Sequence, residues 1–204
     1  LHDALPILVS LAGWLLATQS GLQHSLSWLQ AASGGRLQVG QAAGRWLGPL
    51  RLDEISWQDA AGTAIRAQQL QLEWQPAALG RGELRVDRLV LGRLDITTAP
   101  DDAGPVPEPA QITLPLALSL PALHISHLQI DALPPLLEVE TQLNSDGVRH
   151  QLEQLAFTVA AVRVSAQARL DGQAPFPLQA SAQISGQLEA RPFTLALTAD
   201  GPLA

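Results

Sequence analysis

The stretch LRVDRLVLGRLDI, residues 84–96, has a spacing of apolar residues that fits neither a plain strand nor a plain helix. Successive large apolar residues are two, three, two, three and two positions apart: Leu84, Val86, Leu89, Leu91, Leu94 and Ile96. At about 100° per residue these positions scatter around a helix axis. In a flat strand, each step of three would send the next pair to the opposite face. A bulge or bend at each step of three keeps all six side chains on one face.

The same spacing recurs three times, which indicates a structural cause. The other copies are Leu50, Leu52, Ile55 and Trp57; Ile65, Ala67, Leu70 and Leu72; and Leu118, Leu120, Leu123, Ile125, Leu128 and Ile130. We therefore predict a mostly β fold, an elongated and strongly curved sheet whose apolar face forms a groove. The alternative is a square β-solenoid built from five-residue sides. That fold usually places a small residue where both positions here are large, so we favour the curved sheet.

The rest of the chain is read as strands and turns around this pattern. We take residues 1–7 as a candidate non-native leader, and 8–34 as a truncated membrane anchor followed by a short amphipathic helix. A first groove segment covers 35–98 and a second covers 111–204, with a Pro-rich acidic loop at 99–110 between them. The chain contains no Met and stops within an alternating apolar pattern, so we read it as a fragment.

Residues 4–18, ALPILVSLAGWLLAT, form an apolar run without charge. As a helix this run spans roughly 22 Å, short of the roughly 30 Å hydrocarbon core. We expect the distal part of a signal anchor; a buried core helix and a signal-peptide segment are the alternatives. The helix expected over 20–33 ends at Gly34-Gly35, and its Trp28 belongs either at a membrane interface or in a core. The expected anchor residues are Leu8, Val9, Leu11, Trp14, Leu15 and Leu16.

The composition argues against several functions. The net charge of −7 disfavours a nucleic-acid binder, and the absence of Cys excludes disulfides and thiolate metal sites. None of the common nucleotide-binding, hydrolase or metalloprotease motifs occurs. His124 and His127 lie close in sequence, but we read them as polar residues among Leu and Ile rather than as metal ligands. We expect no enzymatic activity, no metal and no cofactor.

Four short motifs in order resemble the N-terminal region of the TamB family, the translocation and assembly module subunit, within the wider AsmA-like group. They are T-x-x-G at 18–21, G-R-W-x-G-P-L-R-L at 44–52, L-x-L-x-W-x-P-x-x-L at 70–79 and G-x-L-x-V-x-x-L at 82–89. Each motif alone is weak, and their order carries the resemblance. It covers about residues 13–130, and beyond them only the β-rich character continues.

The resemblance implies a single-pass inner-membrane protein with most of its chain in the periplasm. Its groove would carry phospholipid acyl chains towards the outer membrane. A TamA-type outer-membrane partner would be bound by a C-terminal region absent here. The alternative function is a scaffold or chaperone that inserts outer-membrane β-barrel proteins by β-augmentation. The expected groove-lining residues are Leu50, Leu52, Ile55, Trp57, Leu70, Leu72, Leu84, Val86, Leu89, Leu91, Leu94, Ile96, Leu123, Ile125, Leu128 and Ile130.

Overall fold

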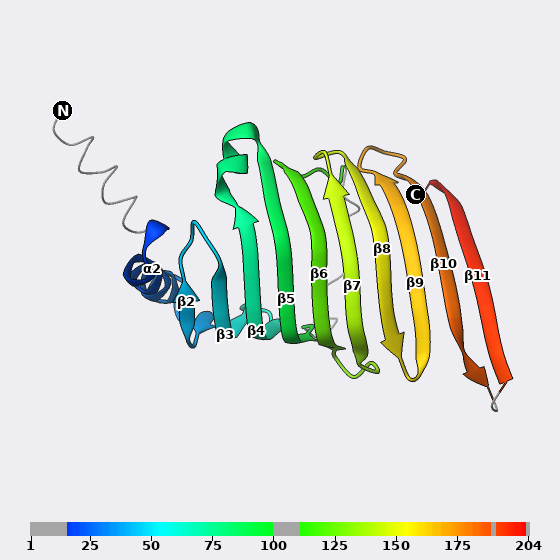
Figure 1. The fold of residues 1–204 in the computed structure, drawn as a ribbon, viewed down its shortest axis with the longest axis horizontal. Coiled ribbons are helices and arrows are strands. Elements are labelled where there is room, and N and C mark those ends of the chain that lie inside the picture. The colour runs from blue at the N-terminus through cyan, green and yellow to red at the C-terminus, as the bar shows by residue number, and fades with distance from the viewer. Residues whose placement is uncertain (1–15, 100–110, 189–190, 203–204) are drawn as a thin grey trace.

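The structure, a computed structural model, describes residues 16–99, 111–188 and 191–202. All its strands belong to one open sheet, with a single α-helix, α2 (Gln19–Ala32), beside the first strands (Figure 1). A 3-10 helix, η1 (Pro76–Arg81), precedes β5. The strands are β1 (Leu37–Val39), β2 (Ala42–Gly44), β3 (Leu50–Gln58), β4 (Ala64–Gln75), β5 (Glu83–Thr97), β6 (Ala117–Ile130), β7 (Leu136–Ser145), β8 (Arg149–Val159), β9 (Val162–Asp171), β10 (Pro177–Leu188) and β11 (Arg191–Pro202).

The strands follow one another across the sheet in nearly the order of the chain. β1 and β2 both pair with β3, and from β3 to β11 each strand lies beside the next. Every pair is antiparallel except β5 and β6, which are parallel. The mostly β prediction is confirmed. The solenoid alternative is wrong, because most of these strands have nine to fifteen residues and join as hairpins instead of coiling in five-residue sides.

The apolar spacing sets the register between neighbouring strands. In the antiparallel pair β3 and β4, Leu50 faces Leu72 and Trp57 faces Ile65. In the parallel pair β5 and β6, residues lie opposite one another at a constant offset, from Leu84 with Leu118 to Ile96 with Ile130. A two-three-two spacing reads the same in both directions. It can therefore align its apolar residues with a parallel or an antiparallel neighbour.

The steps of three coincide with bends that cross the sheet from strand to strand. Gln69 in β4 and Glu138 in β7 adopt positive φ values of 55° and 51°. Gly92 in β5 lies against the Gln69 side chain, where an added Cβ would meet Gln69 Oε1 and come within 3.1 Å of Gln69 Cβ. At the same level the pairing of β5 with β6 is interrupted at Gly92 and Ser126, between the pairs Leu91–Ile125 and Arg93–His127. We call this line of residues the first bend line.

A second bend line crosses nearer the other end of the strands. The register shifts between Glu73 and Trp74 in β4, and between Leu120 and Leu123 in β6. Pro121 lies in the β6 shift, where its missing N–H interrupts no regular ladder. Another shift follows Leu152 in β8. The bulges predicted from the spacing therefore form continuous lines across several strands.

Helix α2 is held at the first strands by its apolar side. Thr18 caps it, with Oγ1 accepting from the Gly21 N–H at 3.0 Å, and it stops before Gly34 and Gly35, which have positive φ. Leu22 is fully buried and Leu26 is 7% exposed, and both pack with Leu50 and Leu52 of β3. The helix predicted over 20–33 is confirmed.

Two tryptophans tie the loop after β2 to the elements on either side of it. Trp46 Nε1 donates to Ser25 Oγ of α2 at 2.7 Å. Trp74 Nε1 of β4 donates to the Trp46 carbonyl, also at 2.7 Å. The helix is therefore fixed to the sheet by hydrogen bonds as well as by apolar packing.

Residues 111–116, the start of the predicted second groove segment, do not extend β6. They run across the strand ends instead, as a strap. The strap donates from Ile112 N to Gly172 O at 2.8 Å and from Leu114 N to Gly147 O at 2.8 Å. An added Cβ at Gly172 would collide with Ile112 O and lie 2.8 Å from Val148 O, so this crossing needs glycine. Of the loop predicted at 99–110, only residue 99 lies within the described residues.

Candidate functional site

The predicted lining residues come together on one side of the sheet, here called the apolar face. Their rows run across the strands. One row joins Trp57, Ile65, Ile96 and Ile130, and the row beside it joins Ile55, Ala67, Leu94, Leu128 and Leu136. Another row, beyond the first bend line, joins Leu50, Leu72, Leu89 and Leu123. Leu84 and Val86 continue the pattern towards the start of β5, opposite Leu118 and Trp74 respectively.

Two clusters of buried side chains form the centre of the apolar face. The first joins α2 to β3, and the second contains Ala67, Leu91, Ile125 and Val139, which are only 5–6% exposed. Ile55 and Leu70 pack against both clusters, so the apolar surface is continuous between them.

The second cluster is buried by its own sheet. Its buried and partly buried members all belong to strands β3 to β8. None of its members belongs to α2 or to η1. Neighbouring rows of this cluster therefore bury one another's side chains across the sheet. We call this apolar face, which crosses the strands, the trough.

The apolar face continues over β9 to β11, where sequence reasoning named no lining residues. One row there joins Leu155, Ala166, Ala182 and Leu197. The next joins Leu152, Ala168, Ala180 and Ala199. The period-two alternation of VRVSAQARL and PLQASAQIS was the signal for these rows, but alanine is too small to mark a face by itself. In β11 the face ends in Phe193, Leu195 and Leu197, which are 38–50% exposed.

The two ends of the trough differ. At the β3 end, α2 closes it with Leu22 and Leu26. At the β11 end no described element covers the last row. Trp57, 37% exposed, lies at a strand end of the face rather than in either cluster. The residues of the face also change, from mostly Leu and Ile in β3–β6 to Ala in the rows of β9 and β10.

The predicted anchor lies mostly outside the described residues. Leu8, Val9, Leu11, Trp14 and Leu15 fall there, while Leu16 is described and 42% exposed. The Leu16 carbonyl accepts a hydrogen bond from the Leu47 N–H at 3.0 Å. Among the described residues, none of the helices has the length and apolar character needed to cross a membrane.

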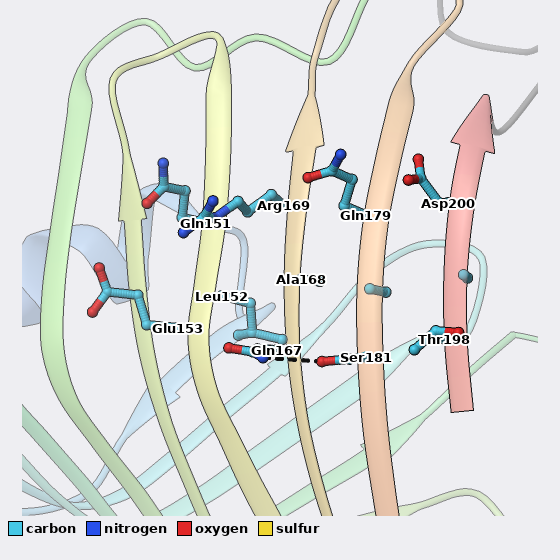
Figure 2. A pocket seen from close by; sticks show the side chains of 12 residues that line it. Gln151, Leu152, Glu153, Gln167, Ala168, Arg169, Gln179, Ser181, Thr198 and Asp200 are labelled. Carbon is cyan, nitrogen blue, oxygen red and sulfur yellow. Dashed lines mark hydrogen bonds between the residues drawn. The ribbon is translucent and has the colours of Figure 1, made fainter. Parts of the chain in front are cut away.

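The opposite side of the sheet is polar and carries shallow depressions. One of them, about 650 Å³, crosses β8 to β11, and Figure 2 shows amide, hydroxyl and charged side chains around it. Gln151, Arg169, Gln179 and Asp200 follow one another across the strands, and Gln167 Nε2 donates to Ser181 Oγ at 3.0 Å. This arrangement lacks a nucleophile paired with a base, and we read it as a hydrated outer surface.

Histidine and carboxylate groups do not converge into a metal site in the described part of the chain. His124 lies 3.5 Å from Glu138 and 3.8 Å from Glu140, and His124 Nε2 is 3.2 Å from Ser126 Oγ. These side chains surround the first bend line on the polar side and are partly exposed. The contacts support the bend without forming a catalytic pair.

Three exposed carboxylates on the sheet are held by local hydrogen bonds. The Thr98 N–H and hydroxyl lower the pKa of Asp131, and the N–H groups of Arg149 and Val148 lower that of Asp146. Hydrogen bonds from the side chains of Gln75 and Arg85 lower the pKa of Asp87. All three remain ionised at neutral pH and contribute to the polar surface.

The fold and the apolar face define a class of protein: an open β-sheet with one continuous aliphatic face. The family model described as TamB, N-terminal domain, matches residues 8–134, which is more than half of the chain. The chain therefore belongs to the TamB N-terminal domain family, as the sequence motifs predicted. Searches among curated proteins and among solved structures each returned no match.

Membership of this family connects the chain with the translocation and assembly module and with outer-membrane biogenesis. The family acts with a TamA-type partner, and its members are membrane-associated proteins of the cell envelope.

Proposed function

We propose that this chain is a non-enzymatic conduit for phospholipid acyl chains. In this proposal, it is anchored in the inner membrane and directs lipids through the periplasm towards the outer membrane. The observation that carries the proposal is the continuous apolar face from Leu50 in β3 to Leu197 in β11. None of the residues in its rows is charged. Towards β11 this surface becomes exposed, and a large exposed apolar patch normally marks an interaction site.

The dimensions of the face suit a lipid tail. Neighbouring strands are about 4.8 Å apart, so the path across β3 to β11 is about 38 Å. That exceeds the roughly 30 Å hydrocarbon core of a whole bilayer. Each methylene removed from water contributes about 0.8 kcal/mol, so an acyl chain gains by lying in the trough, while its headgroup stays in water at the strand ends.

The test is a site-specific photocrosslinker placed in the intact chain in a bacterial envelope. Leu91 and Val90 are consecutive aliphatic residues of β5 on opposite faces, so they form a matched pair. The proposal expects phospholipid adducts, identified by mass spectrometry, with the crosslinker at residue 91 and none at residue 90. Equal labelling at both positions, or none at residue 91, contradicts it.

A second candidate function has its own supporting observation. Among the described residues, β11 pairs only with β10, and an unpaired strand edge can accept another strand. In this alternative, the edge captures outer-membrane β-strands for assembly. A crosslinker at Thr194 of β11 would then capture unfolded barrel segments, and capture there without lipid adducts at residue 91 favours this function.

A further inference from the structure

The outer surface of helix α2 lacks charge. From residue 4 to residue 35 the sequence contains no Asp, Glu, Lys or Arg, although the whole chain carries a net charge of −7. The exposed residues of the helix are instead neutral or aromatic: Gln19, Ser20, Gln23, His24, Ser27, Trp28, Leu29, Ala31 and Ala32. A helix that faces water on its outer side usually carries charges there. This surface is therefore unusual for the protein.

Trp28 stands out on this surface. Its side chain is 67% exposed, the highest value among the large apolar residues described. Trp46 and Trp74, by contrast, hold the helix to the sheet through their indole N–H groups. Trp28 contributes to neither buried cluster, so core packing does not explain it. Indole rings are favoured at the membrane–water interface, where one side is apolar and the other is hydrated.

The position of α2 in the chain points to one occupant. The apolar uncharged run of residues 4–18 leads directly into it. Leu16 and Leu47, 42% and 45% exposed, are joined by a backbone hydrogen bond where that run meets the helix. The membrane–water interface is the environment in which an exposed indole is favoured, and the apolar run brings the chain to that interface.

We propose that the outer surface of α2 lies in the headgroup layer of a phospholipid bilayer, with the helix axis along the membrane plane. The inner side of the helix, Leu22 and Leu26, then holds the β3 end of the trough against the bilayer. This inference goes beyond acyl-chain transport and does not depend on it. The helix seats the sheet on the membrane whether or not lipids enter the trough.

The absence of Cys from the chain makes single-cysteine labelling clean. A polarity-sensitive fluorophore is attached to the intact chain at Trp28→Cys and reconstituted into vesicles of phosphatidylethanolamine and phosphatidylglycerol. The control is Leu133→Cys in the β6–β7 turn, an apolar position that is 61% exposed. Co-sedimentation is not a suitable readout, since the apolar run alone can hold the chain on vesicles. The readout is the depth of each label.

The proposal expects vesicles to protect the residue 28 label from quenching by aqueous iodide. Lipids whose spin label lies about 5–10 Å below the membrane surface should quench it most. The residue 133 label stays open to iodide. His24→Cys and Ser27→Cys, on the same outer surface, should follow residue 28, which keeps the test valid if one variant misfolds. Equal iodide quenching at 28 and 133 overturns the proposal, as does maximal quenching at the bilayer centre. Circular dichroism of each variant verifies the sheet, and lipid adducts at residue 91 are scored separately.

Discussion

Replacing Leu91 by Ala measures whether the apolar face is an open trough or one half of a closed core. Leu91 is 6% exposed, in the middle of the second cluster. The change removes three carbon groups, worth about 0.8 kcal/mol each when fully buried, or about 2.3 kcal/mol at this burial. In an open sheet no rigid layer preserves a cavity above the site, so little is added to that value. Leu195→Ala, at 50% exposure in β11, should cost about 1.2 kcal/mol.

The assay is urea unfolding of the intact chain, monitored by circular dichroism. The unfolding free energies of the two variants are compared with a common m value, the slope of that free energy against urea concentration. A loss above about 4 kcal/mol for Leu91→Ala would refute the open trough, because a cost of that size includes a cavity held by a covering layer. If Leu91→Ala lowers the unfolding free energy by no more than Leu195→Ala does, neighbouring rows do not bury Leu91, and that account is refuted.

Two further perturbations test the strap and the link between β5 and β6. Gly172→Ala places a Cβ on Ile112 O, so it should destabilise the fold by about 2 kcal/mol or more and speed proteolysis within the strap. Gly80→Ala is the control. No atom lies within 4 Å of its added Cβ, so it should change neither the stability nor the proteolysis. Asp131→Ala removes the acceptor of two Thr98 hydrogen bonds. Because those bonds lower the folded pKa of Asp131, their stabilisation is present above its unfolded pKa of about 3.9 and is lost as pH falls through the folded value. The stability difference from the unmodified protein should thus close in acid, and a constant difference from neutral pH to about pH 2 would contradict this account.

The spacing of the apolar residues predicted the strands and their shared apolar face. It predicted bent strands with one apolar face, and Gln69, Gly92 and Pro121 show how the backbone makes the bends. It could not predict that β5 and β6 are parallel, because a spacing that is the same in both directions permits either pairing.

Other parts of the site left weaker signals in the sequence. The alternating residues of the strap satisfy a strand pattern. Its backbone hydrogen bonds nevertheless go to Gly172 and Gly147 rather than to a neighbouring strand. The alanine rows over β9 and β10 give only a weak signal in the sequence, because alanine is too small to mark an apolar face by its spacing alone. The sequence permits Trp28 either at an interface or in a core, and its 67% exposure excludes the core.

The bend lines have a consequence for how such a protein can vary in size. From β4 to β8 the bends recur at matching heights on neighbouring strands, so their positions do not depend on the number of strands in the sheet. Each further hairpin with the same spacing lengthens the sheet by about 10 Å across the strands without moving the bends along them. The length of the apolar face across the strands and its shape along the strands are then separate properties. The number of strands governs the length, and the placement of the steps of three governs the shape.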